Sequence, residues 1–213
     1  FLITIGGTVG SVVVGRINKT VEKVVQTDPI TGDIYETVYG TFVCKNENAS
    51  KDEILSSSIF SQLGKNQIIL LESHGSCVRF FENEDDMHSV IWTGQDYDFA
   101  KEEIDIDYYD LNLVNAEYHE ALSYAFIEKY VGDLTGSLVY LGCCFSAREV
   151  TLAQTFLAKG AEAVVGNSHN TQGQYNSLIE YTTIKYLTKI NPVTNMTYTL
   201  YEAMSEAKEK YGK

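Results

Sequence analysis

Three short apolar runs, each followed by small or polar residues, constrain the fold more than any other feature of the sequence. They are QIILLESHG at 67–75, SLVYLG at 137–142 and AEAVVGN at 161–167. The first run is continuously apolar up to Glu72 rather than alternating, which is typical of a strand buried on both faces of a parallel sheet, and the other two are interpreted as strands of the same kind. Segments with helical spacing follow them. Strands that alternate with helices predict an α/β protein whose open parallel sheet is covered by helices.

The other segments complete this outline. Apolar residues at helical spacing predict helices at 50–64, 115–133, 148–160, 174–190 and 197–212. Asn115 is a plausible N-cap for the second helix, and Gly160 ends the third. The acidic and aromatic region 76–112 shows no sustained period and is interpreted as a long loop with short β-like pieces at 77–81 and 89–93. Two alternating runs joined by PITG predict a β-ribbon within 1–50, ahead of a main domain at 51–213.

The charge and the length of the apolar runs exclude some classes of protein. The 213-residue chain has a formal charge of −13, and nucleic acid is held by Lys and Arg, so we expect no nucleic-acid partner. No apolar run approaches the roughly 20 residues that a membrane-spanning helix needs, so we expect no membrane span. The acidic charge would attract basic peptides or cations instead.

The cysteines do not form a disulfide framework. The four in the chain are too few for a disulfide scaffold, and neighbours such as Cys143 and Cys144 rarely pair with each other. Phe1 stands where an initiator Met would be, which indicates a processed or excised chain and makes the upstream part of its own precursor a candidate partner. An extracellular or cell-surface location is slightly favoured over a cytoplasmic one.

Polar and small residues follow each of the three predicted strands. His74 and Gly75 follow the first strand, Cys143 and Cys144 the second, and Asn-Ser-His-Asn at 167–170 the third. Because ligands bind at the carboxyl ends of parallel strands, we expect these residues to share one edge of the sheet. An imidazole beside a thiol suits nucleophilic thiol catalysis, since one group exchanges the proton of the other. A glycine after the histidine lets the chain turn sharply, and its N–H can face a developing oxyanion.

These segments resemble the caspase-fold cysteine peptidases, a group that includes caspases, clostripain, gingipains, legumain, separase and the caspase-like CHAT domains. IILLESHG is followed, 70 positions after its histidine, by the second cysteine of LVYLGCCFSA, and then by FLAKGAEAVVGN. The similarity covers residues 51–190. It implies a three-layer α/β/α sandwich with a mostly parallel caspase-like sheet, to which 1–50 would add an N-terminal β-ribbon.

The resemblance also implies an activity and a set of site residues. It implies an endopeptidase with a Cys-His dyad that acts on a peptide or protein substrate, with no third catalytic residue and no cofactor. Cys144 aligns with the nucleophile, and Cys143 with the small buried position before it. His74 would be the general acid/base, and the N–H groups of Gly75 and Cys144 would form the oxyanion hole. The residues expected to line the substrate pocket are Gly142, Asn167, Ser168 and His169.

Two departures from the family pattern leave alternatives open. Clostripain and legumain carry an Asp two residues before the nucleophile that helps to bind a basic or polar P1 side chain, whereas this chain has Gly142. Cleavage after basic residues would therefore need an acid from 82–86 or 102–110, and otherwise P1 would be uncharged. The N-terminal ribbon also replaces the usual opening strand–helix–strand. A catalytically silent caspase-like module for binding or surface display is the alternative.

Metal sites are weaker possibilities. The acids that could supply calcium oxygens are Asp105, Asp107 and Asp110, but they lack the spacing of an EF-hand. The residues with side chains of the type that binds zinc are His74, Cys77, Cys143 and Cys144. Structural zinc sites prefer two separated pairs of ligands, and adjacent cysteines ligate one ion poorly. We therefore expect no zinc site, whereas calcium stays an open alternative.

Overall fold

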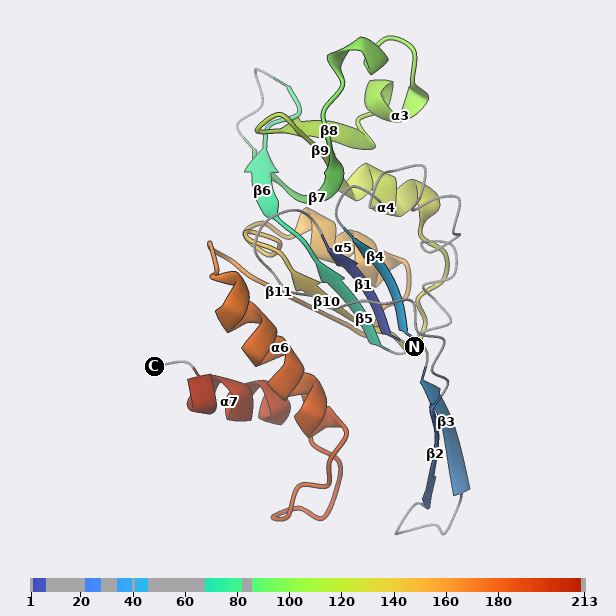
Figure 1. Cartoon of the computed structure of the whole chain (residues 1–213), viewed down its shortest axis with the longest axis vertical. Coiled ribbons are helices and arrows are strands. Elements are labelled where there is room, and N and C mark those ends of the chain that lie inside the picture. The colour runs from blue at the N-terminus through green and yellow to red at the C-terminus, as the bar shows by residue number, and fades with distance from the viewer. Residues whose placement is uncertain are drawn as a thin grey trace. The chain divides into compact units, whose positions relative to one another are not determined.

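Five parallel strands form one sheet in the computed structural model of the chain (Figure 1). Their order is β11-β10-β5-β1-β4. The strands are β1 Leu2–Gly6, β4 Thr41–Lys45, β5 Ile68–Glu72, β10 Leu138–Gly142 and β11 Ala163–Gly166. The strands predicted from the three apolar runs are β5, β10 and β11, which are neighbours with parallel pairing. The predicted α/β class with a parallel sheet is confirmed.

The structure describes residues 2–6, 22–27, 34–39, 41–45, 68–81 and 86–211, the first four ranges as backbone alone. The chain divides into two units, Phe1–His169 and Asn170–Lys213. The helix predicted at 50–64 lies outside the described residues. The predicted division at residue 50 stays a prediction.

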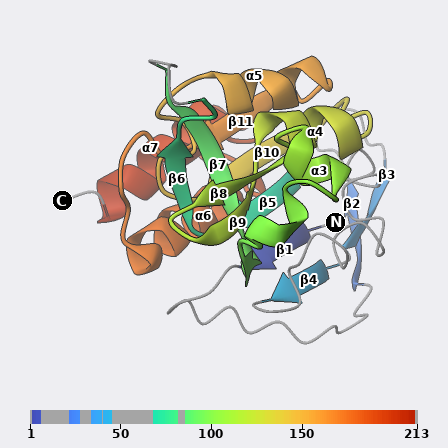
Figure 2. The same ribbon diagram turned by 90° about the horizontal axis from the view of Figure 1, so that it is seen from above.

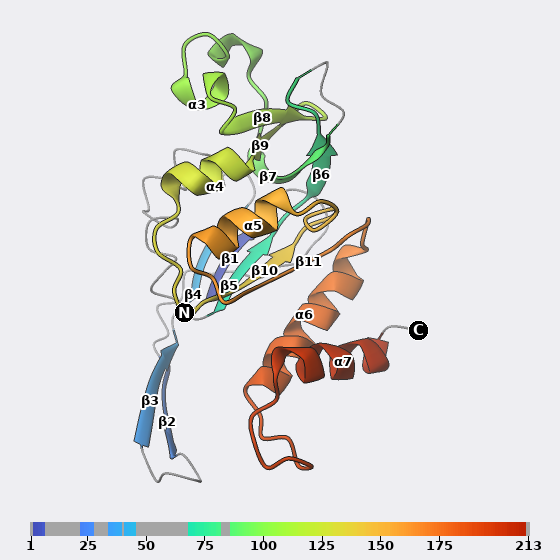
Figure 3. The same ribbon diagram turned by 180° about the vertical axis from the view of Figure 1, so that it is seen from behind.

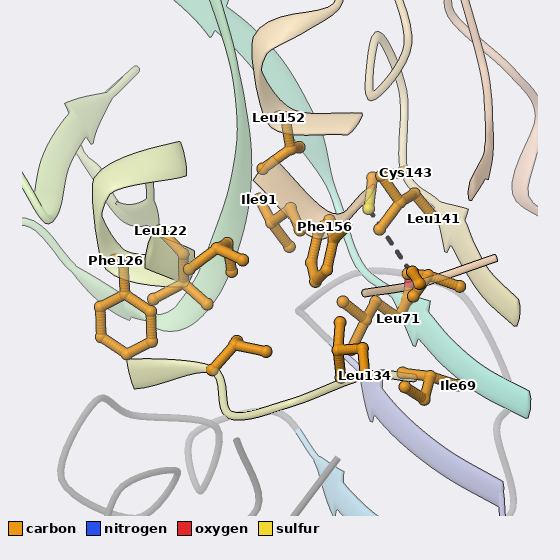
Figure 4. Packing of buried hydrophobic residues seen from close by; sticks show 14 of the residues in the cluster. Ile69, Leu71, Ile91, Leu122, Phe126, Leu134, Leu141, Cys143, Leu152 and Phe156 are labelled. Carbon is orange, nitrogen blue, oxygen red and sulfur yellow. Dashed lines mark hydrogen bonds between the residues drawn. The ribbon is translucent and has the colours of Figure 1, made fainter. Parts of the chain in front are cut away.

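Two helices of the first unit share one hydrophobic core with the parallel sheet (Figure 3). They are α4 Tyr124–Tyr130 and α5 Thr151–Ala158. Leu152 and Phe156 lie four residues apart on α5, so they face the same side, and both are fully buried with Leu71 of β5 and Leu141 of β10 (Figure 4). Burying one such side chain contributes about 1.5–3 kcal/mol. This core fixes β5 and β10 beside each other.

A second, antiparallel sheet follows β5, where the sequence analysis placed a long loop (Figure 2). Its order is β6-β7-β9-β8. The strands are β6 Gly75–Val78, β7 His88–Asp96, β8 Leu113–Ala116 and β9 His119–Leu122, with a 3₁₀ helix η3 Phe99–Lys101 and a short helix α3 Ile106–Tyr109 between β7 and β8. The β-like pieces predicted at 77–81 and 89–93 overlap β6 and β7, whereas the loop prediction was wrong where β7 continues to Asp96 and where η3 and α3 form.

The helix predicted at 115–133 was wrong in its first half. Residues 113–122 form the β8–β9 hairpin, whose turn residues Glu117 and Tyr118 have positive φ angles of 56° and 71°. Two successive positive φ angles are typical of a tight hairpin turn. Asn115 does not cap a helix, because its Oδ1 accepts a hydrogen bond from the Tyr118 N–H across this turn, at 2.8 Å. The helix starts later, where the Ser123 hydroxyl oxygen caps α4.

Buried carboxylates hold the segment around α3 against the second sheet and α4. Asp107 is 2% exposed and accepts hydrogen bonds from Asn112, Lys129 and Tyr130. Glu120 of β9 accepts hydrogen bonds from Thr93 of β7, at 3.0 Å, and from Tyr108 of α3, at 2.5 Å. Burial and the hydrogen bond with Glu120 raise the pKa of Tyr108, which therefore keeps its proton. Satisfied in this way, the carboxylates can stay buried.

The unit Asn170–Lys213 contains two helices, α6 Gly173–Leu187 and α7 Leu200–Tyr211. Helix α7 lies inside the predicted range 197–212, and α6 starts one residue before the predicted range 174–190 and ends inside it. Ile190 and Thr197 form an antiparallel bridge in the connection between the helices. In the N-terminal region, β2 Glu22–Thr27 and β3 Ile34–Tyr39 pair antiparallel. None of the helices in the described part of the chain is long and apolar enough to cross a membrane.

Candidate active site

The candidate site lies where β5 and β10 end side by side. Gly142, the last residue of β10, pairs in register with Glu72, the last residue of β5. The strands are parallel, so the residues that follow each of them leave the sheet at the same edge. Those residues are Ser73, His74 and Gly75 after β5, and Cys143, Cys144 and Phe145 after β10.

Gly75 packs directly against the two cysteines. A Cβ atom at this position would overlap the carbonyl oxygen of Cys144 and lie 2.8 Å from Cys143 Cβ and 3.1 Å from the carbonyl oxygen of Val90. Two of these three neighbours are backbone atoms, which cannot turn away as a flexible side chain can. Only glycine therefore fits between the cysteines and β7, and its small size brings the His74–Gly75 and Cys143–Cys144 segments into contact.

The adjacent cysteines have different surroundings. Cys143 is fully buried in the core, where its Sγ donates a hydrogen bond to the carbonyl oxygen of Leu71, at 3.5 Å (Figure 4). This burial confirms the prediction that Cys143 fills a small buried position. Cys144 is only partly buried. Of the two cysteines, Cys144 is therefore the one that keeps solvent-accessible surface.

The turn after Cys144 is tightly held. Phe145 has a φ angle of +58°, in the left-handed region, so the chain reverses sharply behind the cysteine. Its N–H donates to the carbonyl oxygen of His169, at 3.3 Å, and its carbonyl oxygen accepts from the Ser89 hydroxyl, at 2.7 Å. The buried Ser146 hydroxyl oxygen accepts from the Asn167 N–H, at 3.1 Å. These bonds connect the turn to β7 and to the segment after β11.

The segment after β11 supplies the expected rim of the substrate pocket. Asn167 Nδ2 donates to the carbonyl oxygen of Cys143, at 3.2 Å, so this side chain lies next to the cysteine pair. Ser168 Oγ and His169 Nδ1 are 2.9 Å apart and share a hydrogen bond on the exposed side. Gly166 allows the close approach, because a Cβ there would lie 2.9 Å from Ser146 Oγ. That these residues and Gly142 contact a substrate stays a prediction.

His74 is held through residues that the sequence analysis did not single out. Its carbonyl oxygen accepts from the Trp92 N–H of β7, at 3.0 Å, and the two rings lie 5.3 Å apart between centroids. The Ser73 hydroxyl donates to the carbonyl oxygen of Trp92, at 2.7 Å. Ser89, which contacts Phe145, was also missed. The one available signal was the apolar run SVIWT at 89–93, which contains the single tryptophan of the chain.

Among the described residues, no group of three or more His, Cys, Asp or Glu side chains is placed to hold a metal ion. Asp105 caps α3 by accepting from the Asp107 N–H, and Asp107 is occupied by its three donors. Cys77 Sγ lies 3.8 Å from Ser89 Oγ, and burial raises the pKa of the Cys77 thiol. A raised pKa lowers the thiolate fraction at neutral pH and with it the reactivity of this cysteine.

No protein-family model matches the sequence, and the search of curated proteins found no matching relative.

Proposed function

We propose that the chain is a cysteine endopeptidase in which Cys144 is the nucleophile and His74 the general acid/base. The observation that carries this proposal is the packing of Gly75 on the carbonyl oxygen of Cys144 and the Cβ atom of Cys143. Because of this packing, the segment that carries His74 lies directly against the segment that carries the partly buried Cys144. A dyad needs such proximity, since the imidazole must exchange a proton with the sulfur.

The reaction would proceed through an acyl-enzyme. His74 takes the thiol proton of Cys144, the resulting thiolate attacks the carbonyl carbon of the scissile peptide bond, the C–N bond breaks, and His74 donates that proton to the departing amine. Water then attacks the thioester while His74 accepts one of its protons, the C–S bond breaks, the peptide leaves as a carboxylic acid, and His74 returns the proton to the sulfur, which restores the thiol. Atoms and charges balance without a cofactor.

The N–H groups of Gly75 and Cys144 are the proposed oxyanion hole. The position of Gly75 in the second sheet supports this role. The Trp92 N–H of β7 donates to the carbonyl oxygen of His74, just before β6, so in the alternation of an antiparallel ladder the next pair, Gly75 and Ile91, takes a non-hydrogen-bonded place. The Gly75 N–H is therefore directed away from β7 and can bind an oxyanion.

We also propose that the parallel sheet, which includes β1 and β4, belongs to a three-layer α/β/α sandwich of the caspase kind. Two observations support this. The strand that ends before His74 neighbours the strand that ends before Cys144, and α5 connects β10 to β11.

Cleavage after a basic P1 residue is the proposed specificity, with an uncharged P1 as the alternative. The acidic charge of the chain favours basic peptides at long range, but a buried cationic side chain also needs a paired acid in the pocket. Turnover of a peptide library with varied P1, compared between the wild type and Ala variants of the acids at 82–86 and 102–110, separates the two. A preference for Asp at P1 would contradict both.

Covalent labelling tests the nucleophile. A peptide acyloxymethyl ketone should modify Cys144, and mass spectrometry of the digested protein identifies the labelled residue. Cys77 is the internal control, because its raised pKa predicts slow alkylation. Uniform labelling of the cysteines, or none, would contradict the proposal and favour the catalytically silent module.

Substitutions test the dyad itself. Cys144→Ala and His74→Ala should each abolish peptide turnover, whereas Cys143→Ala should keep most of it and lose some stability. An inactive Cys143→Ala with an active Cys144→Ala would place the nucleophile one residue earlier.

A further inference from the structure

We propose that Trp92 is the positioning residue of His74: its indole holds the imidazole in the orientation that faces Cys144. The proposal rests on the proposed function, in which His74 is the acid/base. Trp92 itself touches neither the reacting atoms nor the nucleophile in this role. It would act only through the orientation of the histidine ring.

Backbone contacts fix Trp92 beside His74. The Trp92 N–H donates to the His74 carbonyl oxygen at 3.0 Å, and the Trp92 carbonyl oxygen accepts the Ser73 hydroxyl at 2.7 Å. The backbone N–H and the carbonyl oxygen of Trp92 are therefore bound to His74 and Ser73, the two residues that precede Gly75. The backbone of His74 cannot shift along the sheet edge without breaking these bonds.

Side-chain contacts fix the indole in turn. Its Nε1–H donates to Ser76 Oγ at 3.1 Å, and Ser76 is only 8% exposed. The His119 ring stacks on the indole, with 4.3 Å between centroids and 28° between planes. His119 Nδ1 lies 3.6 Å from Asp96 at the end of the same strand as Trp92. The indole is thus held by a donor bond and a stacked ring, and presents a rigid surface.

The His74 imidazole lies against this surface. The centroids of the two rings are 5.3 Å apart and the ring planes are tilted by 48°, which is within the range of favourable aromatic pairs. Among the described residues, no side chain or carbonyl group accepts a hydrogen bond from the imidazole of His74. The terminal torsion of a histidine is otherwise broad, so the ring contact is what selects one orientation there.

Kinetics of three variants test the role. Trp92→Ala should lower kcat about tenfold, because the loss of one aromatic contact can lower the fraction of molecules with a correctly oriented His74 by about that factor. KM should stay within about threefold of the wild-type value. Trp92→Phe keeps a ring and should recover most of kcat. Phe80→Leu is the matched control, because Phe80 and Trp92 both pack at the border of the same cluster of Val90, Val114, Ala116 and Ala121. Phe80 contacts His88 instead of His74, so its removal should cost stability and leave kcat unchanged.

Nuclear magnetic resonance tests the orientation without any substrate. The chain has four histidines, so their ring proton signals can be assigned from single His→Gln variants. An indole ring current shifts the signals of nearby rings. In Trp92→Ala the signals of His74 and His119 should both move, while His88, which lies against Phe80 and Tyr124, should keep its shifts.

The outcomes separate this proposal from the proposed function. Unchanged His74 signals in a folded Trp92→Ala, or a loss that falls on KM alone, would overturn the positioning role. A Trp92→Phe variant as slow as Trp92→Ala would overturn it as well. If no peptide is cleaved by the wild type, the proposed function fails, and the histidine signals still decide whether the Trp92 indole lies against His74 in solution.

Discussion

The Ser89 hydroxyl donates a hydrogen bond to the carbonyl oxygen of Phe145, at 2.7 Å, and so fastens the second sheet to the turn that follows Cys144. Ser89 is fully buried, and its N–H also donates to Glu149 Oε1, at 2.8 Å. One residue of β7 thus supports both the turn after the proposed nucleophile and the segment that leads into α5.

Replacing Ser89 by Ala should lower the free energy of unfolding by about 1–2 kcal/mol, because a buried carbonyl oxygen loses a donor. Under the proposed function it should also slow the labelling of Cys144 by a peptide electrophile, since the turn is less firmly held. Urea unfolding and the labelling rate measure the two effects. The control is Thr188→Ala, which removes an exposed hydroxyl that bonds locally to Lys185 and should change neither.

Gly75→Ala should destabilise the protein by about 1–3 kcal/mol, as overpacking does, because its Cβ would overlap the backbone of Cys144. The same variant should lose peptide turnover, since the cysteine and histidine segments must separate to admit the methyl group. Gly173→Ala is the control, because a Cβ there meets no atom within 4 Å. Thermal unfolding and turnover report the result; a Gly75→Ala protein as stable and active as the wild type would refute the close packing.

Asp107→Asn should lower the free energy of unfolding by about 2–3 kcal/mol, because the buried carboxylate loses its charge opposite Lys129 and one of its acceptor oxygens. Asp110→Asn is matched in chemistry, but its carboxylate is about half exposed and lies 3.9 Å from Lys129. A surface pair of this kind contributes at most about 1 kcal/mol. Urea titrations of both variants compare them, and equal losses would contradict the buried role of Asp107.

The carboxylate of Glu149 should make stability depend on pH. Burial acts to raise the pKa of Glu149, but hydrogen bonds from Thr151 and Ser89 outweigh burial and set the pKa below its ordinary value of 4.5. A carboxyl whose pKa falls on folding contributes stability above pH 4.5, and that contribution is lost as the pH falls through the lower pKa of the folded protein.

Glu149→Gln should therefore cost about 1 kcal/mol at pH 7 and less at pH 3. Urea unfolding of both proteins across this range measures the difference. Glu162→Gln, at an exposed position, should show no difference at either pH. A loss for Glu149→Gln that is the same at both pH values would mean that the charge of Glu149 does not stabilise the fold.

The sequence predicted those elements in which apolar residues form an unbroken run or recur at helical spacing. Strands β5, β10 and β11 are uninterrupted apolar runs, and α6 and α7 follow helical spacing, so both kinds of element were found. The second sheet was predicted only as two short β-like pieces, because polar residues occupy its buried positions: Ser89 and Thr93 on β7, and Glu120 on β9, are all at most 3% exposed. A register shift between Trp92 and Asp96 breaks the alternation further.

Of the candidate site, the part that depends only on where the parallel strands end could be predicted from the sequence. The rule that parallel strands end at one edge suffices to place His74 near Cys144. The contacts of Trp92 with His74 and of Ser89 with Phe145 depend on the register of β7 against β6, which no period in the sequence reveals. The β8–β9 hairpin was hidden for a related reason, because Glu117 and Tyr118 stand where a tight turn usually has Asn and Gly.

The neighbouring positions of β5 and β10 have a consequence for the order of folding. Seventy positions separate His74 from Cys144, and the whole second sheet and α4 lie between them in the chain. Closing so long a loop costs entropy before the pairing of β5 with β10 stabilises anything, and such distant parallel pairing is slow. A chain still emerging from the ribosome would thus have its thiol and imidazole far apart. On refolding, the fluorescence of Trp92 should change with the hairpins first, and the reactivity of Cys144 should return last.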